Sequence, residues 1–223
     1  METSELREHT RQYILQNCIV RAPPGSFELP ALGGGYYTWQ FYLRAACLNA
    51  KCLEFIAKDF WDRFHNHDFQ LAGVEASAVP IMTAILLAFD KMGKRILVTG
   101  GAGFLGSNLC QTLLDRGEEG NHHLNAFTIR KERKTYGLKN LIEGRPNKLP
   151  VLIVDDLTSQ QHGTFWRAIE AVRGEKLELF NSCYVMVRKE AKDDNNTILT
   201  SLGPVTIESP FTLDDFNLNM RKN

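Results

Sequence analysis

The chain has 223 residues, with 26 Lys and Arg balanced by 26 Asp and Glu. This length suits one α/β domain with a sizeable core, and the balanced charge argues against a nucleic-acid partner. The odd number of cysteines and the absence of a CxxC pair indicate a reduced, cytoplasmic protein without a disulfide or zinc framework. The charged N-terminus METSELREHT does not resemble a signal peptide, and the longest apolar run, VPIMTAILLAF, is too short to cross a membrane.

The N-terminal part of the chain combines a helical pattern with an aromatic segment. Residues 5–18 have the apolar spacing of a helix, and the APPG sequence at residues 22–25 ends it. Three glycines at residues 33–35 then indicate a turn, and YYTWQFYLR at residues 36–44 predicts a strand. A simple aromatic hairpin at the edge of the fold is equally compatible with this composition.

The next segments predict a helix, a buried strand and a tight turn. Residues 49–64 have the apolar periodicity of an amphipathic helix, and FQLAGV at residues 69–74 predicts a short buried strand. Glu75, Ala76 and Ser77 separate this strand from a second helix. Small residues at such a junction let the backbone approach a ligand closely, although tight strand-to-helix turns without a ligand are common.

A glycine-rich segment follows, KRILVTGGAGFLGSNLCQTLLDRGEE at residues 94–119. It contains a GxGxxG turn, formed by Gly101, Gly103 and Gly106, between a predicted strand and a predicted helix. The segment resembles the NAD-binding start of extended short-chain dehydrogenases. However, the next strand ends in Arg130 and Lys131 instead of an acidic residue, and the chain has no YxxxK pair. Basic residues at that position would suit the 2′-phosphate of NADP. We interpret residues 94–120 as an inserted, mainly structural βα unit, with NAD(P) binding as the alternative.

A cluster of basic residues follows the predicted strand LNAFTIR. Arg130, Lys131 and Lys134 lie within the sequence RKERK, and Tyr136 follows. Clustered cations stabilise the charge that develops on a leaving pyrophosphate. The alternative interpretation is a solvated, charged loop.

The sequence VLIVDDLTSQQHGT, residues 151–164, is the strongest candidate for a ligand site. Its apolar run predicts a strand buried on both faces of a parallel sheet, which ends at Asp155 and Asp156. Open α/β sheets bind ligands at this end of their strands. A loop follows that can bind an anion at the start of a helix, through Thr158, Ser159, Gly163 and Thr164. Carboxylates beside an anion site suit a ribose phosphate, although a buried strand followed by an acidic turn is a common pattern.

Together, these motifs resemble the orotate phosphoribosyltransferases, which are type I phosphoribosyltransferases. The aromatic segment, GVEASAVP, RKERK, VLIVDD and Arg188 follow one another in that family's order. The resemblance implies an α/β type I phosphoribosyltransferase fold in a single domain of residues 1–223. Its mainly parallel sheet would be flanked by helices, with a small hood from about residues 20–45 and 175–217. Three features depart from the family: no lysine precedes the glycine turn, Tyr136 replaces a common histidine, and Gln160, Gln161 and His162 enlarge the phosphate loop.

The resemblance also implies an activity. The enzyme would transfer 5-phosphoribose from 5-phosphoribosyl 1-diphosphate (PRPP) to orotate or a related base and release pyrophosphate, a step of pyrimidine nucleotide synthesis. Asp155 and Asp156 would hold the ribose, directly or through Mg²⁺. The pyrophosphate would be bound by Glu75, Ala76, Ser77, Arg130, Lys131, Lys134 and Tyr136. The resemblance assigns Thr158, Ser159, Gly163 and Thr164 to the 5-phosphate and Arg188 to the base, and it implies a homodimer. The alternatives are a non-catalytic PRPP- or nucleotide-binding module, or an NAD(P)-binding protein that uses Gly101, Gly103 and Gly106.

Overall fold

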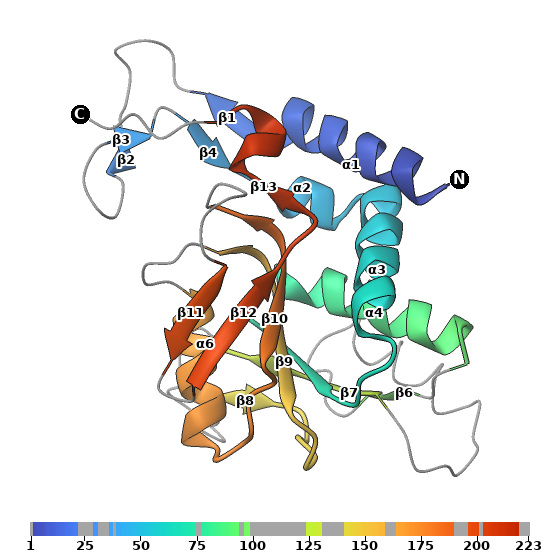
Figure 1. The fold of residues 1–223 in the computed structure, drawn as a ribbon, viewed down its shortest axis with the longest axis vertical. Helices are drawn as coiled ribbons and strands as arrows, with labels where there is room; N and C mark the ends of the chain where they lie inside the picture. The colour runs from blue at the N-terminus through green and yellow to red at the C-terminus, as the bar shows by residue number, and fades with distance from the viewer. Residues whose placement is uncertain are drawn as a thin grey trace.

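The central element of the fold is a mainly parallel β-sheet covered by helices on both faces (Figure 1). The structure is a computed structural model, and it describes residues 2–21, 29–30, 36–37, 39–74, 77–93, 96–98, 124–130, 141–158, 164–189, 196–200 and 203–218. Within these residues, the strands of the sheet follow the order β11-β12-β10-β9-β5-β7-β6. Their bounds are Thr197–Thr200, Gly203–Glu208, Ser182–Arg188, Val151–Thr158, Gln70–Val74, Leu124–Ile129 and Ile96–Val98.

Most neighbouring strands of this sheet run in the same direction. The parallel pairs join β6, β7, β5, β9, β10 and β12, and the short strand β13 (Phe211–Thr212) continues the edge beside β10. The antiparallel partners are β11 on β12 and β8 (Ile142–Glu143) on β7. Every residue of β5 is buried, as are the first five of β9. Burial on both faces explains why these strands have apolar runs without polar alternation, and it confirms the parallel α/β fold expected from the sequence.

Helices cover one face of the sheet with a large core. This core joins α1 (Thr3–Asn17), α2 (Arg44–Cys47), α3 (Ala50–Phe64) and α4 (Ala78–Lys91) to β5, β9 and β10. Helix α3 begins where the Asn49 side chain accepts hydrogen bonds from the backbone N–H groups of Lys51 and Cys52, both at 3.1 Å. This is a standard N-cap arrangement, and it satisfies two donors that the helix itself cannot. The opposite face of the sheet packs against α6 (Thr164–Gly174).

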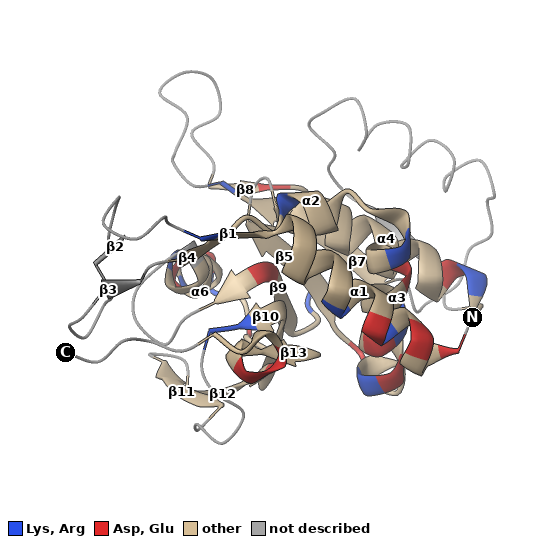
Figure 2. Ribbon diagram, turned by 90° about the horizontal axis from the view of Figure 1, so that it is seen from above, with Lys and Arg blue, Asp and Glu red and all other residues tan. Residues whose placement is uncertain are grey.

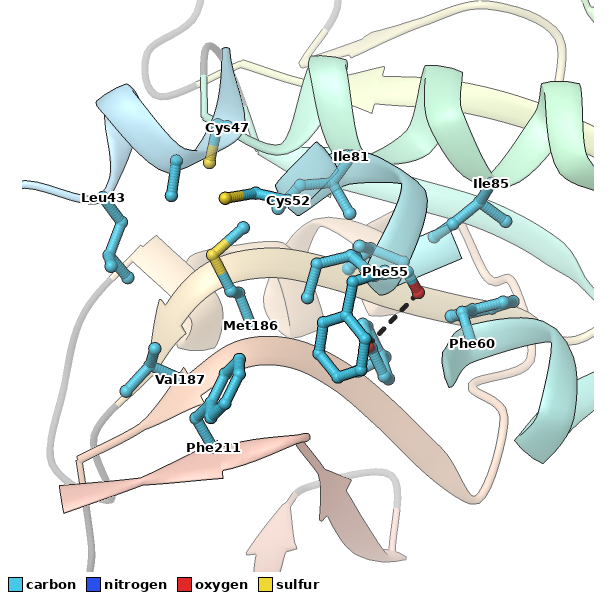
Figure 3. Packing of buried hydrophobic residues seen from close by; sticks show 14 of the residues in the cluster. Leu43, Cys47, Cys52, Phe55, Phe60, Ile81, Ile85, Met186, Val187 and Phe211 are labelled. Carbon is cyan, nitrogen blue, oxygen red and sulfur yellow. Dashed lines mark hydrogen bonds between the residues drawn. The ribbon is translucent and has the colours of Figure 1, made fainter. Parts of the chain in front are cut away.

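Aromatic rings fill much of the large core (Figure 3). The ring of Phe60 lies 5.1 Å from that of Tyr184 and 4.7 Å from that of Phe64, measured between centroids. Tyr184 is fully buried, and its hydroxyl donates a hydrogen bond of 2.9 Å to a carboxylate oxygen of Asp59. The polar end of this ring is therefore satisfied, as burial of a tyrosine requires.

The N-terminal hairpin forms a separate small layer beside the sheet. Strand β1 (Ile19–Arg21) pairs with β4 (Trp39–Phe41), and β2 (Leu29–Pro30) pairs with β3 (Tyr36–Tyr37), both antiparallel. The predicted strand of residues 36–44 is too long, because helix α2 already begins at Arg44. The 3₁₀ helix η1 (Leu213–Phe216) meets this hairpin through the rings of Phe41 and Phe216, 5.5 Å apart.

The C-terminal range assigned to the hood, residues 175–217, lies mostly elsewhere. Strands β10 and β12 belong to the central sheet, because β10 pairs with β9 and β12 extends the sheet beyond β10. The end of this range, at η1, contacts the N-terminal hairpin. Of the helices within the described ranges, none has the length and apolar character needed to cross a membrane.

Candidate active site

Four parallel strands bring the candidate residues to one edge of the sheet. The strand registers pair Val74 with Ile129 and Gly73 with Val154, and they place Arg188 beside Thr158. The carboxyl ends of β5, β7, β9 and β10 are therefore level. Figure 2 shows the acidic end of β9 and the basic end of β10 next to each other. This edge is where open α/β sheets bind ligands.

The acidic pair at the end of β9 contains two carboxylates in different environments. Asp155 is 2% exposed, and its Oδ1 accepts hydrogen bonds from Ser77 Oγ at 3.1 Å and from the Asp156 N–H at 2.9 Å. Burial first, and then the negative charge of Asp156, raises the pKa of Asp155 well above its ordinary value. Asp156 is only partly buried. Asp155 is thus held by the protein, while Asp156 is the more accessible carboxylate.

Ser77 reaches Asp155 because helix α4 begins very close to β5. A Cβ added at Gly73 would lie 2.6 Å from the Cβ of Ala78 and 2.9 Å from the Sδ of Met82. Only glycine permits this approach, since carbon atoms in contact are normally about 3.5–4.0 Å apart. The small residues at this junction were expected to make room for a ligand, but Gly73 makes room for the helix. Glu75 and Ala76 lie outside the described residues.

Cys47 is a neighbour of the acidic pair that the sequence did not indicate. It ends helix α2, is 1% exposed, and lies in the core between α2, α3 and β10 (Figure 3). Burial raises the pKa of its thiol, and the charges of Asp156 and Asp155 raise it further. Its separation in sequence from VLIVDD left no signal, because only the packing of α2 brings the two together.

The phosphate loop begins later than the sequence predicted. Strand β9 continues through Thr158, which is 4% exposed and whose carbonyl accepts a hydrogen bond of 3.0 Å from the Lys189 N–H. The assignment of Thr158 to the loop is therefore wrong, because pairing with β10 extends the strand beyond the apolar run. Ser159 and Gly163 lie outside the described residues, and Thr164 is the first residue of α6.

Two arginines lie at the same edge of the sheet. Arg188 ends β10 and is 5% exposed, beside Thr158 and therefore close to the acidic pair. Arg130 follows β7, and its guanidinium forms an ion pair with Glu143 of β8. The Arg130 side chain is thus already bound to a carboxylate. Lys131, Lys134 and Tyr136 lie outside the described residues.

The glycine-rich segment is described only at its first strand, since Gly101, Gly103 and Gly106 lie outside the described residues. Strand β6 adds to the sheet beside β7, as the predicted βα unit requires, and it ends at Val98 opposite Ala126. This end is about 10 Å below the carboxyl end of β7, because β7 continues for three residues to Ile129. In addition, β7 and β5 separate β6 from the acidic strand β9. A dinucleotide-binding fold instead places its acidic residue on the strand next to the glycine-rich turn.

The chemistry of the acidic pair suits Mg²⁺ only with the help of a substrate. Among the described residues, no group of three or more His, Cys, Asp and Glu side chains is arranged to hold a metal ion. Mg²⁺ prefers oxygen ligands and is often bound by one or two carboxylates together with substrate phosphates. Asp155 and Asp156 offer such carboxylates, with Asp156 the more accessible.

Comparisons with known proteins agree with this architecture. A phosphoribosyltransferase from Corynebacterium diphtheriae superposes with a TM-score of 0.62 at 16% identity, covering 96% of this chain and 99% of that one. Mycobacterium tuberculosis orotate phosphoribosyltransferase gives 0.58 at 17% identity, with the same coverage of both chains. The UMP synthase of Leishmania donovani gives 0.60 at 20% identity, covering 93% of this chain and 36% of that one.

These similarities establish that the chain has the type I phosphoribosyltransferase fold. The similar structures include orotate enzymes, and the mycobacterial one has also been solved with PRPP, with a TM-score of 0.50. A family model described as "NAD dependent epimerase/dehydratase family" matches residues 96–160, well under half of the chain. No curated protein sequence matches significantly.

Proposed function

We propose that this protein is a phosphoribosyltransferase that transfers 5-phosphoribose from PRPP to orotate or a related base. The observation that carries the proposal is the acidic pair at the carboxyl edge of the sheet. Asp155 is fixed there by Ser77, Asp156 is accessible beside it, and Arg188 lies on the next strand. In the reaction, the bond between ribose C1 and the pyrophosphate oxygen breaks, and a bond from C1 to a ring nitrogen of the base forms.

The acidic pair would bind the ribose of PRPP. Asp156 would accept hydrogen bonds from the ribose hydroxyls, since it is the more exposed of the two carboxylates. Its negative charge would also stabilise the positive charge that develops at C1 as the leaving group departs. Asp155 would hold the end of β9 in place through its bonds to Ser77 and to the Asp156 N–H.

The pyrophosphate and the phosphate would be held by segments on either side of this pair. Lys131 and Lys134 would neutralise the leaving pyrophosphate, together with Tyr136 and the backbone around Glu75 and Ala76. Mg²⁺, when bound with PRPP, would supply further positive charge to the leaving oxygens. The turn that includes Ser159, Gly163 and Thr164, at the start of α6, would bind the 5-phosphate.

The acceptor base would contact the end of β10. Arg188 can pair with a carboxylate such as that of orotate, because a guanidinium binds carboxylates through two parallel hydrogen bonds. We also propose a homodimer in which the basic loop serves the partner's site. The absence of a lysine before the glycine turn and the bulky residues at 160–162 instead favour a module that binds PRPP without turnover.

A second candidate function is NAD(P) binding, which is favoured by the family model that matches residues 96–160. Against it stand the separation of β6 from β9 and the low position of the carboxyl end of β6. The insert would then serve mainly to extend the sheet along the outer edge of β7.

Calorimetric titrations of the full chain with PRPP plus Mg²⁺, with NAD⁺ and with NADP⁺ would separate these functions. We expect saturable binding of PRPP alone, and we expect it to be lost in Asp156→Asn. The matched control is Asp214→Asn, which changes an exposed aspartate in η1 and should leave binding unchanged. Binding of NAD⁺ or NADP⁺ without binding of PRPP would overturn the proposal.

A further inference from the structure

Strands β7 and β8 form the two sides of the basic segment, residues 131–140. Thr128 pairs with Glu143 and Ile129 with Ile142, in antiparallel register. The Arg130 N–H then donates a hydrogen bond of 2.9 Å to the carbonyl of Leu141. The segment therefore leaves the sheet and returns to it at the same point, as the tip of a hairpin does.

Arg130 and Glu143 link the two sides through their side chains. Arg130 lies opposite Leu141, so Glu143 is its diagonal neighbour on the facing strand, a position from which long side chains can reach each other. The guanidinium and the carboxylate form an ion pair, and their side chains are only 17% and 16% exposed. The apolar residues beside them, Ile129 and Ile142, are 1% and 8% exposed and pack into the core beneath α6.

This pairing gives Arg130 a role different from the one its sequence context implies. A cation that binds pyrophosphate must exchange its partner for the substrate, whereas Arg130 already has a carboxylate partner in a poorly exposed place. Breaking a buried ion pair by removing one partner leaves an uncompensated charge, which is costly. The neighbouring Lys131 and Lys134 lie farther along the segment and are the cations assigned to pyrophosphate.

We infer that Glu143 is a positioning residue, which acts through Arg130 to hold the base of the basic segment in register with the acidic pair. The inference rests on the proposed phosphoribosyltransferase activity. Glu143 would set where Lys131 and Lys134 enter the site without touching the substrate. Arg130 would be the other half of this clamp, and its charge would serve Glu143 and not the leaving group.

Three variants test the clamp: Glu143→Gln, Arg130→Glu, and the exchanged pair Arg130→Glu with Glu143→Arg. We expect kcat for pyrophosphate release to fall by roughly 10- to 100-fold in each single variant, because small misplacements of catalytic groups cost about that much. The KM for the base should change little. The exchanged pair should recover most of the lost kcat, because it restores the ion pair with the charges reversed.

The matched control is Glu208→Gln, which removes a carboxylate partner of Arg63 far from the basic segment in sequence. It should leave kcat unchanged. If the exchanged pair is no better than Arg130→Glu, Arg130 contacts the substrate itself and the inference is wrong. Wild-type kinetics in Glu143→Gln would also overturn it.

Hydrogen exchange gives a readout that does not depend on turnover. In the wild type the Arg130 amide should be protected, since it is bonded to the Leu141 carbonyl. Glu143→Gln should accelerate exchange in peptides spanning residues 124–145, and the exchanged pair should restore protection. Unchanged exchange in Glu143→Gln would contradict the clamp. If the wild type released no pyrophosphate, the proposed function would fail, and the exchange data would still decide whether Glu143 holds the segment.

Discussion

The close packing of helix α4 on strand β5 should make Gly73 essential for both stability and ligand binding. In Gly73→Ala, the new Cβ would lie 2.6 Å from the Cβ of Ala78, which is fixed to the helix backbone and cannot rotate away. The start of α4 must therefore move by about 1 Å to reach an ordinary carbon contact of about 3.5–4.0 Å. The other close neighbour, Met82, can adjust its flexible side chain, so Ala78 determines the cost.

The expected loss of stability follows from two opposing terms. Overpacking a core typically costs about 1–3 kcal/mol, whereas replacing glycine within a strand by alanine gains roughly 0.5–1 kcal/mol in conformational entropy. We expect a net destabilisation of about 1–2 kcal/mol. In a chain of this size, such a change lowers Tm by roughly 2–8 °C.

The same displacement should weaken PRPP binding. Ser77 immediately precedes α4, and its hydroxyl is 3.1 Å from Asp155 Oδ1, close to the limit of a useful hydrogen bond. Moving the start of the helix would break this bond and release the end of β9. Thermal unfolding and calorimetric titration with PRPP measure the two effects separately.

Two variants make this prediction sharp. Gly174→Ala is the control, because a Cβ at Gly174 meets nothing within 4 Å, and we expect no loss of stability or binding. Ala78→Gly combined with Gly73→Ala removes the clashing atom and should restore much of the Tm. A Gly73→Ala protein as stable as the wild type, with unchanged PRPP affinity, would refute the reasoning.

Two further predictions concern polar groups buried at opposite ends of the sheet. Burial raises the pKa of Asp155 above its ordinary value of 3.8, so the folded state disfavours the ionised form and stability falls as pH rises between these two values. Asp155→Asn should therefore have a higher Tm than the wild type at pH 7, a difference that disappears below about pH 4 in thermal scans, and it should bind PRPP poorly. A lower Tm at pH 7 would contradict this account. Asn125 is fully buried and donates hydrogen bonds to Gln70 Oε1 at 3.1 Å and to the Arg145 carbonyl at 2.9 Å. Asn125→Leu should cost roughly 1–3 kcal/mol in urea unfolding, because these acceptors lose a donor, yet leave PRPP affinity unchanged. A loss of affinity would show that the two ends of the sheet are coupled.

The sequence predicted the central sheet well because burial leaves a strong local signal. Strands β5, β9 and β10 are covered on both faces, so their residues are apolar without alternation. The acidic pair was predicted for a related reason, since charged residues directly after such a run lie at the edge where ligands bind. The first strand of the inserted unit, β6, was also predicted from its apolar run.

Features that depend on contacts between distant segments were not predicted. Thr158 belongs to β9 because β10 pairs with it, and no local pattern shows where that pairing stops. Cys47 reaches the acidic pair through the packing of α2, and Arg130 meets Glu143 through the short strand β8. The role of Gly73 in helix packing was hidden for the same reason, because a glycine before a turn has many explanations.

The most direct test of the account is pyrophosphate release by the full chain with PRPP, Mg²⁺ and orotate, compared with Lys134→Ala. We expect the wild type to release pyrophosphate only when both PRPP and a base are present. In Lys134→Ala, we expect kcat to fall by about 100-fold or more, with Tm unchanged, because the lost cation stabilises the leaving group. Wild-type protein that binds PRPP but releases no pyrophosphate with orotate or related bases would contradict an enzymatic role. Undiminished release by Lys134→Ala would contradict the assignment of the basic segment.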